Sequence, residues 1–383
     1  MKIKTEILQN MVSKVIQGAS FNKMIPLTSL IGIEFKEDSM GGKGNLILTT
    51  TDGSNQLKIN QEVEGTGEFY TIVNADTFAK LVGKTTKEFI ELENKENYLE
   101  VKGNGDYKLE IAINEEGEMV RFPDIPNLQG TELSINLKEL QEAIKVSKAS
   151  IAKTMEIPCL TGYYIGKNTI TTDRQLICKL DKELITEPIL ISSEMAELLL
   201  LVEGDEILEL IIKDNEIEHF DIETNETEIE KLPSDLIFYN ANYTLYGKEL
   251  EGKELYPEDK ILNLDKLEYT DSVKVNKQEL LNVLDRMSLF VSDYDKNGVF
   301  LSFTKEGLIV RSQKSNAEEI IAIDTDANKE LKEITCLIDI EMLKSEVEVV
   351  STDNVEIYYG QDKMIKIVDG NTTFVLSLLD KVN

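Results

Sequence analysis

Three stretches of this chain share one pattern of hydrophobic and polar positions. In residues 133–150, LSINLKELQEAIKVSKAS, a short alternating segment leads into a segment in which Leu140 and Ile144 fall on one side of a helix. Alternation predicts a strand, and apolar residues recurring every three to four positions predict an amphipathic helix. The same pattern begins at Ile3 and at Val275, shifted by 132 and 140 residues from its position in the middle copy. A spacing near one third of 383 residues indicates one domain that occurs three times.

The segments between these patterns follow one order in each third of the chain. Alternating strand-like runs come first, then a second short helix, then further alternating runs, including separate strands at 207–212 and 217–222. The second helices are predicted at 76–82, 193–201 and 340–346. Two helices on a mostly antiparallel sheet make an α+β domain. The expected domains are residues 1–125, 126–262 and 263–383, and the second carries an additional stretch, 234–255, without a counterpart.

The composition limits where and how the protein acts. An apolar content of 41% predicts packed cores. The net charge of −30 argues against a free-standing nucleic-acid binder, because phosphate contacts need Lys and Arg. Three widely spaced cysteines without a CxxC pair predict a reduced protein. The chain shows no signal-peptide core and no apolar run near the ~20 residues of a membrane span, so we expect a cytoplasmic protein without membrane contact.

Three local patterns resemble chemical sites but lack the residues that would complete them. Residues 83–85 resemble the end of a phosphate-binding loop, but Phe78 stands where the motif needs glycine. Residues 293–304 begin like a calcium loop, but Thr304 replaces the glutamate at its twelfth position. His219 is the single histidine, which leaves little material for histidine zinc sites or Ser–His catalysis. We predict no catalytic centre, no cofactor and no metal site.

Four short motifs carry a resemblance to a known family. They are FPDIP at 122–126, TTDRQLIC at 171–178, YPEDK at 256–260 and FVLSLL at 374–379. None is specific alone, but their order and spacing along the whole chain resemble the bacterial sliding clamp, the β subunit of DNA polymerase III. The resemblance implies three clamp domains per subunit and a head-to-tail homodimer ring with helices around its hole. It implies a processivity factor that encircles double-stranded DNA and tethers DNA polymerase, with the clamp loader and repair proteins as further partners.

The resemblance also assigns three groups of residues by position. The DNA-facing group is Lys14, Lys23, Lys80, Lys84, Lys138, Lys145 and Lys148. The partner-peptide pocket is Leu160, Thr172, Arg174, Gln175, Leu176, Met364, Val375, Leu376, Ser377 and Leu378. The dimer interface is Tyr107 and Leu109 on one side and Phe290 and Val291 on the other.

Two departures from the family pattern change what we expect. Arg174 and Gln175 stand, one residue short, where the family has a glycine and a basic residue, and Leu378 replaces a proline. We therefore expect a pocket that prefers a different peptide. Glu194 and Glu197 stand where the family has a basic helix start, so retention on DNA depends more on ring closure than on affinity.

Three alternatives remain open on the sequence alone. A specialised or mobile-element clamp with its own polymerase would explain the altered pocket and the stretch 234–255. A scaffold that does not bind DNA is another option, and a hole more positive than the rim would argue against it. An acidic hydrolase would need two converging carboxylates, for which the threefold repeat gives no reason.

Overall fold

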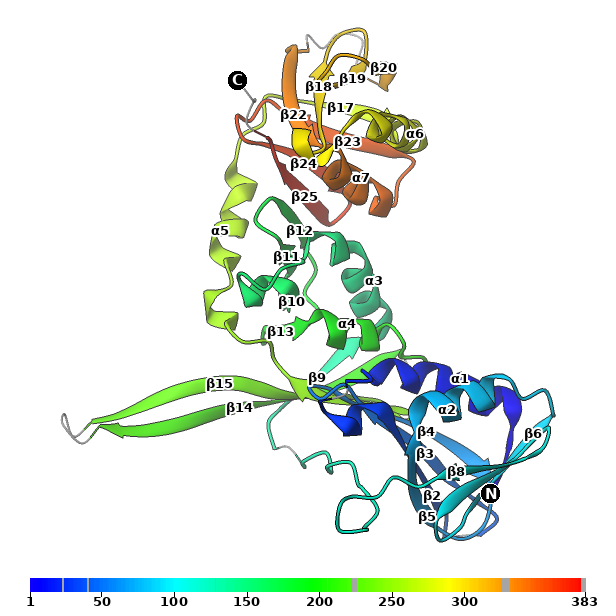
Figure 1. Ribbon diagram of the computed structural model, residues 1–383. Helices are drawn as coiled ribbons and strands as arrows, with labels where there is room; N and C mark the ends of the chain where they lie inside the picture. The colour runs from blue at the N-terminus through cyan, green and yellow to red at the C-terminus, as the bar shows by residue number, and fades with distance from the viewer. Residues whose placement is uncertain are drawn as a thin grey trace. The chain divides into compact units, whose positions relative to one another are not determined.

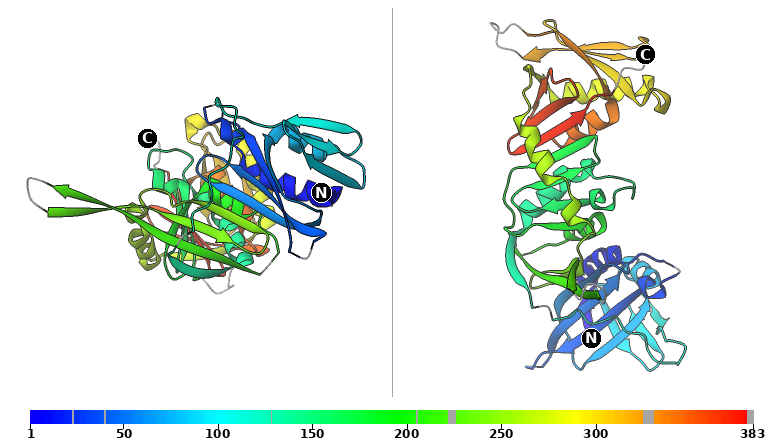
Figure 2. Two further views of the ribbon diagram at one scale, coloured as in Figure 1. Left: turned by 90° about the horizontal axis from the view of Figure 1, so that it is seen from below. Right: turned by 90° about the vertical axis from the view of Figure 1, so that its left-hand side faces the viewer.

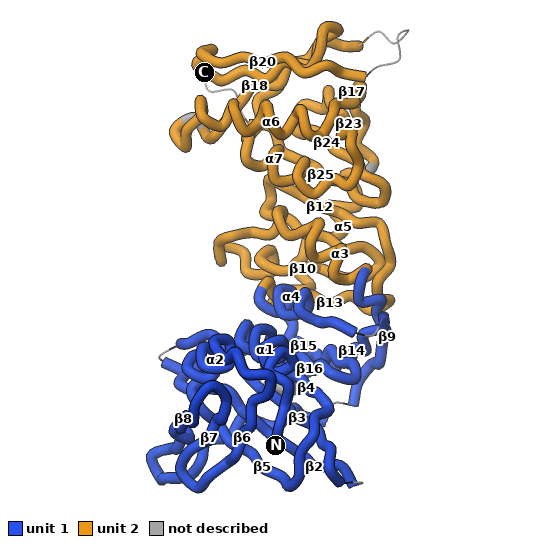
Figure 3. Tube along the Cα trace, turned by 90° about the vertical axis from the view of Figure 1, so that its right-hand side faces the viewer, with its two compact units in different colours: residues 1–138, 194–249 blue, residues 139–193, 250–383 orange. Residues whose placement is uncertain are grey.

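The computed structural model describes residues 1–22, 24–39, 41–127, 129–204, 206–221, 226–324 and 331–379, with the backbone alone at 218–221, 226–228, 265 and 295. These residues form the helices and strands of Figure 1, which Figure 2 shows from two further directions. The chain divides into two compact units, coloured separately in Figure 3. Unit 1 comprises residues 1–138 and 194–249, and unit 2 comprises residues 139–193 and 250–383. The boundary passes through the second expected domain, so the limits of the three domains stay predictions.

The first third of the chain lies in unit 1 and contains two helices packed on strands. Helix α1 (Thr5–Val15) buries Leu8 and Val12. Helix α2 (Ala75–Gly83) follows Asn74, whose side chain accepts a hydrogen bond from a backbone N–H three residues on, at 2.9 Å. An asparagine there satisfies one of the unpaired donors of the first turn. The helices contact each other and strands β2 to β5. The strands are β1 (Lys2–Lys4), β2 (Leu30–Glu37), β3 (Lys43–Thr51), β4 (Gln56–Glu64), β5 (Phe69–Asn74), β6 (Phe89–Asn94), β7 (Tyr98–Lys102) and β8 (Asp106–Glu110).

The middle third repeats the order, with its elements divided between the two units. Helices α3 (Leu137–Ser147) and α4 (Ser193–Leu199) each cross a unit boundary. Unit 1 contains β9 (Thr131–Asn136), β14 (Ile207–Asp221), β15 (Glu226–Tyr239) and β16 (Tyr243–Lys248). Unit 2 contains β10 (Gly162–Ile165), β11 (Thr169–Thr172), β12 (Leu176–Leu180) and β13 (Ile189–Ser192).

The last third lies in unit 2, after a connecting segment that contains the short helix α5 (Glu258–Leu262). Helices α6 (Lys277–Met287) and α7 (Ile340–Val349) pack on each other, and α6 buries Leu280 and Leu284 in the core. The strands are β17 (Asp271–Asn276), β18 (Gly298–Phe303), β19 (Leu308–Ser312), β20 (Glu318–Ile321), β21 (Ile323–Asp324), β22 (Ile334–Asp339), β23 (Asn354–Tyr359), β24 (Met364–Asp369) and β25 (Thr372–Ser377). The three strand-to-helix patterns of the sequence are therefore β1–α1, β9–α3 and β17–α6.

Each of two joints between thirds of the chain is a pair of antiparallel strands. In unit 1, β16 pairs with β4, with Leu245 opposite Leu57. In unit 2, β25 pairs with β12, with Phe374 opposite Cys178. Each of these repeats ends with three consecutive strands, and β16 and β25 are the last of the three. Each repeat thus extends a sheet of the preceding repeat through backbone hydrogen bonds.

The long hairpin of β14 and β15 distinguishes the middle repeat. These strands span 15 and 14 residues, whereas the equivalent β6 and β7 span 6 and 5. The two strands expected at 207–212 and 217–222 are one strand, β14, with an irregularity between Lys213 and Asn215. The stretch 234–255 contains β16, the counterpart of β8 and β25, so the surplus residues lie in the β14–β15 hairpin instead. The side chain of His219 lies outside the described residues.

The two proline-containing segments are anchored by aromatic side chains. Phe122 of FPDIP is buried, and its ring lies where a side chain on Gly32 would be. Tyr256 of YPEDK stacks on Tyr164 with ring centroids 5.0 Å apart, and its hydroxyl donates to the carbonyl of Ile170 at 3.0 Å.

Among the described residues, no helix is both long and apolar enough to cross a membrane.

Candidate functional site

The main candidate site is a hollow of about 390 Å³ in unit 2. Its wall is formed by the loop that leads from the end of α3 to Pro158, by Leu160 just after it, and by the turn between β11 and β12. Leu160 is only 3% exposed, and Ile157 is a partly exposed apolar neighbour. The lining residues are Ala152, Thr154, Glu156, Ile157, Leu160, Asp173, Arg174 and Gln175. The hollow therefore combines an apolar floor with carboxylate, guanidinium and amide groups.

The turn between β11 and β12 is held by two side chains of its own sequence. The hydroxyl of Thr172 accepts from the backbone N–H of Arg174 at 3.0 Å and donates to the carbonyl of Leu176 at 2.8 Å. One carboxylate oxygen of Asp173 accepts from the N–H groups of Gln175 and Leu176, at 2.9 and 2.7 Å. Thr and Asp form such local turns because their short side chains reach the backbone two or three residues on. The turn thus presents Arg174 and Gln175 to the hollow in a fixed backbone conformation.

The first repeat contains a copy of this turn. Thr51 accepts from the N–H of Gly53 at 3.1 Å and donates to the carbonyl of Asn55 at 2.6 Å. Asp52 accepts from the next two N–H groups of its turn, at 2.7 and 2.6 Å. Gly53 has φ of 101°, and Arg174, at the same position of the second copy, has φ of 82°. A positive φ favours glycine, which has no side chain. In the second copy of the turn, the long side chain of Arg174 occupies this position instead.

The floor of the hollow rests on a small buried cluster. Leu160, Tyr164, Ile170 and Tyr256 pack together there. Burial raises the pKa of the Tyr256 hydroxyl far above its ordinary value, so this group acts as a neutral hydrogen-bond donor. A packed floor of this kind keeps the shape of the hollow fixed before any ligand arrives.

The C-terminal strand lies against the same turn. The N–H of Ser377 donates to the carbonyl of Gln175 at 2.8 Å, and the N–H of Leu378 donates to the carbonyl of Lys363 at 2.7 Å. The structure therefore brings the predicted pocket residues from both parts of the chain together. Of these, Leu160, Arg174 and Gln175 line the hollow. The others do not line it: Thr172, Leu176, Val375 and Leu376 are buried, and Met364, Ser377 and Leu378 are half-buried.

Five lining residues were not foreseen from the sequence. They are Ala152, Thr154, Glu156, Ile157 and Asp173. Four belong to the loop after α3, which has neither strand nor helix periodicity. Asp173 belongs to the motif TTDRQLIC. Its Thr-Asp pair indicates a turn, and this is the one sequence signal that points to Asp173.

Six of the seven predicted DNA-facing lysines lie on or next to helices α1, α2 and α3. Lys14 pairs with Glu203 at 2.6 Å, and Lys80 pairs with Asp76 at 2.7 Å. Lys23 lies outside the described residues. Exposed are Lys84, Lys138, Lys145 and Lys148. Within their bounds α1, α2, α3 and α6 carry equal numbers of acidic and basic residues, whereas α4 and α7 carry more acidic ones. Four of these helices are therefore neutral in a strongly acidic chain, whereas α4 and α7 share its negative charge.

Two of the sheet edges in the described part of the chain are candidates for pairing with a further strand. β8 ends the sheet of unit 1, and β20 ends a sheet of unit 2. Each carries an exposed apolar side chain, Tyr107 on β8 at 38% and Ile320 on β20 at 53%. Of the predicted interface residues, Leu109 is half-buried on β8, and Phe290 and Val291 follow helix α6. An open edge with exposed apolar residues is a place where another strand can add.

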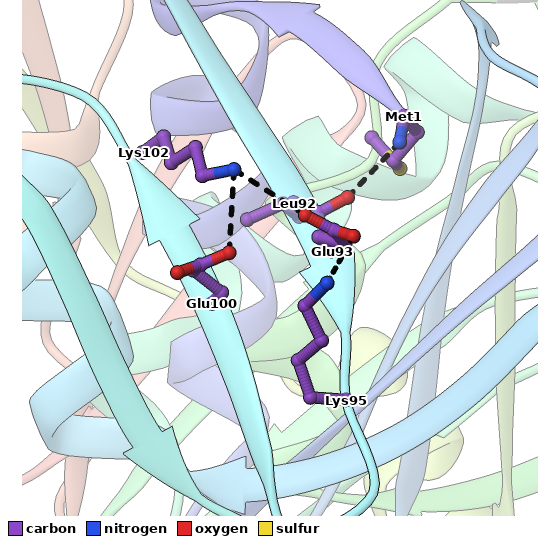
Figure 4. A network of polar contacts seen from close by, with 6 residues as sticks. All are labelled: Met1, Leu92, Glu93, Lys95, Glu100 and Lys102. Atoms are coloured by element: carbon purple, nitrogen blue, oxygen red, sulfur yellow. Dashed lines mark hydrogen bonds and ion pairs between the residues drawn. The ribbon is translucent and has the colours of Figure 1, made fainter.

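A second hollow, of about 340 Å³, lies in unit 1 beside a network of charges. Figure 4 shows this network on β6 and β7, where Glu93 pairs with both Lys95 and Lys102. Lys102 also reaches Glu100 at 3.3 Å, and the amino group of Met1 donates to the carbonyl of Leu92 at 2.9 Å. Both carboxylates drawn there are paired with lysines. No group of three His, Cys, Asp or Glu side chains in the described ranges is placed to hold a metal ion.

Comparison with known proteins assigns the fold. No family model matches the chain. A beta sliding clamp of Lactococcus lactis subsp. lactis (strain IL1403) is 21% identical over 366 residues, which cover 93% of this chain and 91% of that protein. The structure of DNA polymerase III subunit beta from Borrelia burgdorferi, in complex with a natural product, matches with a TM-score of 0.80 at 17% identity, covering 100% of this chain and 99% of that one. This chain has the sliding-clamp fold.

A third match agrees with this assignment. A DNA polymerase sliding clamp from Pseudomonas aeruginosa, solved with a ligand, has a TM-score of 0.78 at 16% identity over 99% of each chain. The predicted α+β fold class and the resemblance to the sliding clamp are confirmed. The individual site residues of the sliding-clamp resemblance stay predictions.

Proposed function

We propose that this chain is a sliding clamp: two copies close head to tail around double-stranded DNA and tether a DNA polymerase for processive synthesis. The clamp acts in the cytoplasm, has no active site of its own, and is served by a clamp loader. Repair proteins share its peptide-binding hollow. The similarity in sequence and fold to beta sliding clamps supports the proposal.

The observation that carries the proposal is the pattern of strand addition between repeats. β16 adds to β4, and β25 adds to β12. β4, β12 and β20 are equivalent strands of the three repeats, and so are β8, β16 and β25. One donor strand, β8, and one acceptor strand, β20, remain without such a partner in the described chain. A second copy supplies both missing partners, and two copies joined in this way at both ends form a closed ring of six repeats.

Ring closure also accounts for the charge of the chain. A protein that binds DNA by contacts alone needs Lys and Arg at the phosphates. The neutral helices α1, α2, α3 and α6 give weak contacts, which suit a ring that slides and is retained because it is closed.

The proposed interface between copies, the pairing of β8 with β20 of a second copy, is called the seam. It is tested by the mass of the particle in solution. We expect twice 43.3 kDa by sedimentation for the unmodified protein. Tyr107→Asp combined with Ile320→Asp should give monomers, because each places a charge at an edge that must lose water on pairing. Ile217→Asp, an equally apolar-to-charged change on the exposed β14–β15 hairpin, is the matched control and should leave the dimer intact. A dimer that survives the double change would refute this seam.

Encirclement is tested by locking the seam chemically. Single cysteines on β8 and β20 are joined by a bismaleimide after subunits separated by dilution have been concentrated again in the presence of a nicked circular plasmid, so that rings form around the DNA. The native Cys159, Cys178 and Cys336 are buried, so the new thiols react first. A locked ring should stay on the circle in high salt and detergent and leave it once a restriction enzyme linearises the DNA. Release before linearisation would contradict encirclement.

A scaffold that does not bind DNA is the second candidate, and the acidic balance of α4 and α7 favours it. The same plasmid experiment separates the two functions. A dimer that locks but never retains the circle would be a ring with another cargo.

A further inference from the structure

We propose that the hollow beside Arg174 binds an extended peptide through two groups, an apolar side chain against Leu160 and Ile157 and a carboxylate held by the guanidinium of Arg174. The inference rests on the proposed function, in which partners dock through short peptides. It adds the chemistry that such a peptide must have for this chain.

The conformation of Arg174 is the first reason. Its φ of 82° lies in the left-handed region, where a residue with a side chain is disfavoured by roughly 1 kcal/mol against glycine. The same turn in the first repeat, with the same Thr and Asp hydrogen bonds, has Gly53 at this position. The fold itself therefore has no need for arginine here. Because the same turn forms with glycine in the first repeat, the strained arginine indicates a role in binding instead of in folding.

The free state of the guanidinium is the second reason. Arg174 is exposed, lines the hollow, and forms no ion pair with any described residue. By contrast, Arg286, on α6, is paired with Glu319. A planar guanidinium offers parallel N–H donors that match a carboxylate in two-point contact. The unpaired donors of Arg174 therefore suit an acidic group on the ligand.

The other charges of the hollow limit where that group lies. Asp173 accepts two N–H groups of the turn through one carboxylate oxygen, and these amides offset part of its negative charge. Glu156 is exposed on the loop that leads from the end of α3 to Pro158, and its negative charge repels a ligand carboxylate. The ligand carboxylate must then sit next to Arg174, while the apolar side chain enters toward Leu160. Either an Asp or Glu side chain or the C-terminus of the peptide can supply the carboxylate.

The test uses the full chain and four fluorescein-labelled hexapeptides that share two leucines. One has Glu beside the leucines, one has Gln there, one has Lys there, and these three end in an amide. The fourth has Gln and a free C-terminal carboxylate. Fluorescence anisotropy gives each Kd. We expect the Glu peptide, the free-carboxylate peptide or both to bind roughly tenfold more tightly than the amidated Gln peptide.

Three variants assign the effect to named residues. Arg174→Gly should abolish the advantage of the carboxylate peptides and at the same time raise the urea midpoint of unfolding, because strain is relieved. Glu156→Gln should tighten the carboxylate peptides. Lys167→Gln removes an exposed positive charge outside the hollow and is the matched control, expected to change neither.

Each remaining outcome contradicts a definite statement. Equal affinity for the Glu, Gln and free-carboxylate peptides overturns the role of Arg174 and leaves a peptide-binding clamp intact. Tightest binding of the Lys peptide, weakened by Glu156→Gln, assigns the hollow to a basic ligand and also overturns it. Failure of every peptide to bind overturns both this inference and the peptide-binding part of the proposed function.

Discussion

Replacing Glu346 by Gln should change how the stability of the protein depends on pH. Glu346 lies on α7 and is 0% exposed. One of its carboxylate oxygens accepts a hydrogen bond from the hydroxyl of Ser150 at 2.8 Å, and the other has no partner among the described residues. Burial raises the pKa of this carboxyl from 4.5 to about 8, although the Ser150 bond opposes the shift, and the charge of Asp173 adds to it.

The sign of the effect follows from the two pKa values. Below pH 4.5 the carboxyl is neutral in both the folded and the unfolded chain, so it costs nothing. Between pH 4.5 and about 8 the unfolded chain releases the proton more readily, and the folded state loses stability as the pH rises. From pH 5 to pH 8 the loss amounts to about 3 kcal/mol. Glutamine keeps the oxygen that faces Ser150 and carries no charge, so the variant lacks this loss.

The assay is urea unfolding followed by circular dichroism at pH 5, 6, 7 and 8. Other carboxylates titrate in both proteins, so the difference between variant and wild type is the quantity to plot. We expect that difference to move by about 3 kcal/mol in favour of Glu346→Gln between pH 5 and pH 8. Glu348→Gln, an exposed neighbour on the same helix, is the control and should show no such movement. A pH-independent difference for Glu346→Gln would refute the reasoning.

Substitutions at two positions and one labelling experiment test the packing of the core, a helix cap and the burial of a thiol. Leu284→Ala should lower the free energy of unfolding by about 2–5 kcal/mol, measured by urea unfolding, because it empties space in the core beneath α6; a loss below 1 kcal/mol would contradict a packed core there. Asn276→Ala should cost about 1 kcal/mol in the same measurement, because its side chain accepts the N–H of Glu279 at 3.0 Å, and Asn276→Asp should restore most of the loss. Cys178 should react with a thiol reagent only as fast as the chain opens, because burial raises the pKa of its thiol well above the ordinary value; rapid labelling in native buffer would contradict its burial.

The sequence predicted those parts of the fold that depend on periodicity. Leu137, Leu140 and Ile144 fall on one side of α3, and all three are buried, because a helix with such a face must pack it against the sheet. The order of elements within each repeat followed from the same reasoning. The boundaries of strands were less accurate: the break expected near residue 213 is a register shift in the β14–β15 ladder. One residue of β14 stands opposite two of β15 there, and the ladder continues on both sides.

The site was harder to predict than the fold. Arg174 and Gln175 were found from a motif, but Thr154 and Glu156 come from a loop whose conformation depends on the packing of Leu160 and Tyr256. No local pattern encodes such a placement. The left-handed conformation of Arg174 was equally hidden, because arginine does not signal positive φ as glycine does.

The pairing of β25 with β12 has a consequence for synthesis of the chain. β12 emerges from the ribosome nearly two hundred residues before Phe374, the residue that will lie opposite Cys178. Until then, the edge of β12 is exposed and able to pair with the wrong strand. β4 and its partner β16 are separated by a similar length of chain, from Leu57 to Leu245. A ribosome that stalls within the last third would therefore leave a nascent chain with an uncovered edge. Chaperones that shield exposed strand edges would be needed most at that stage.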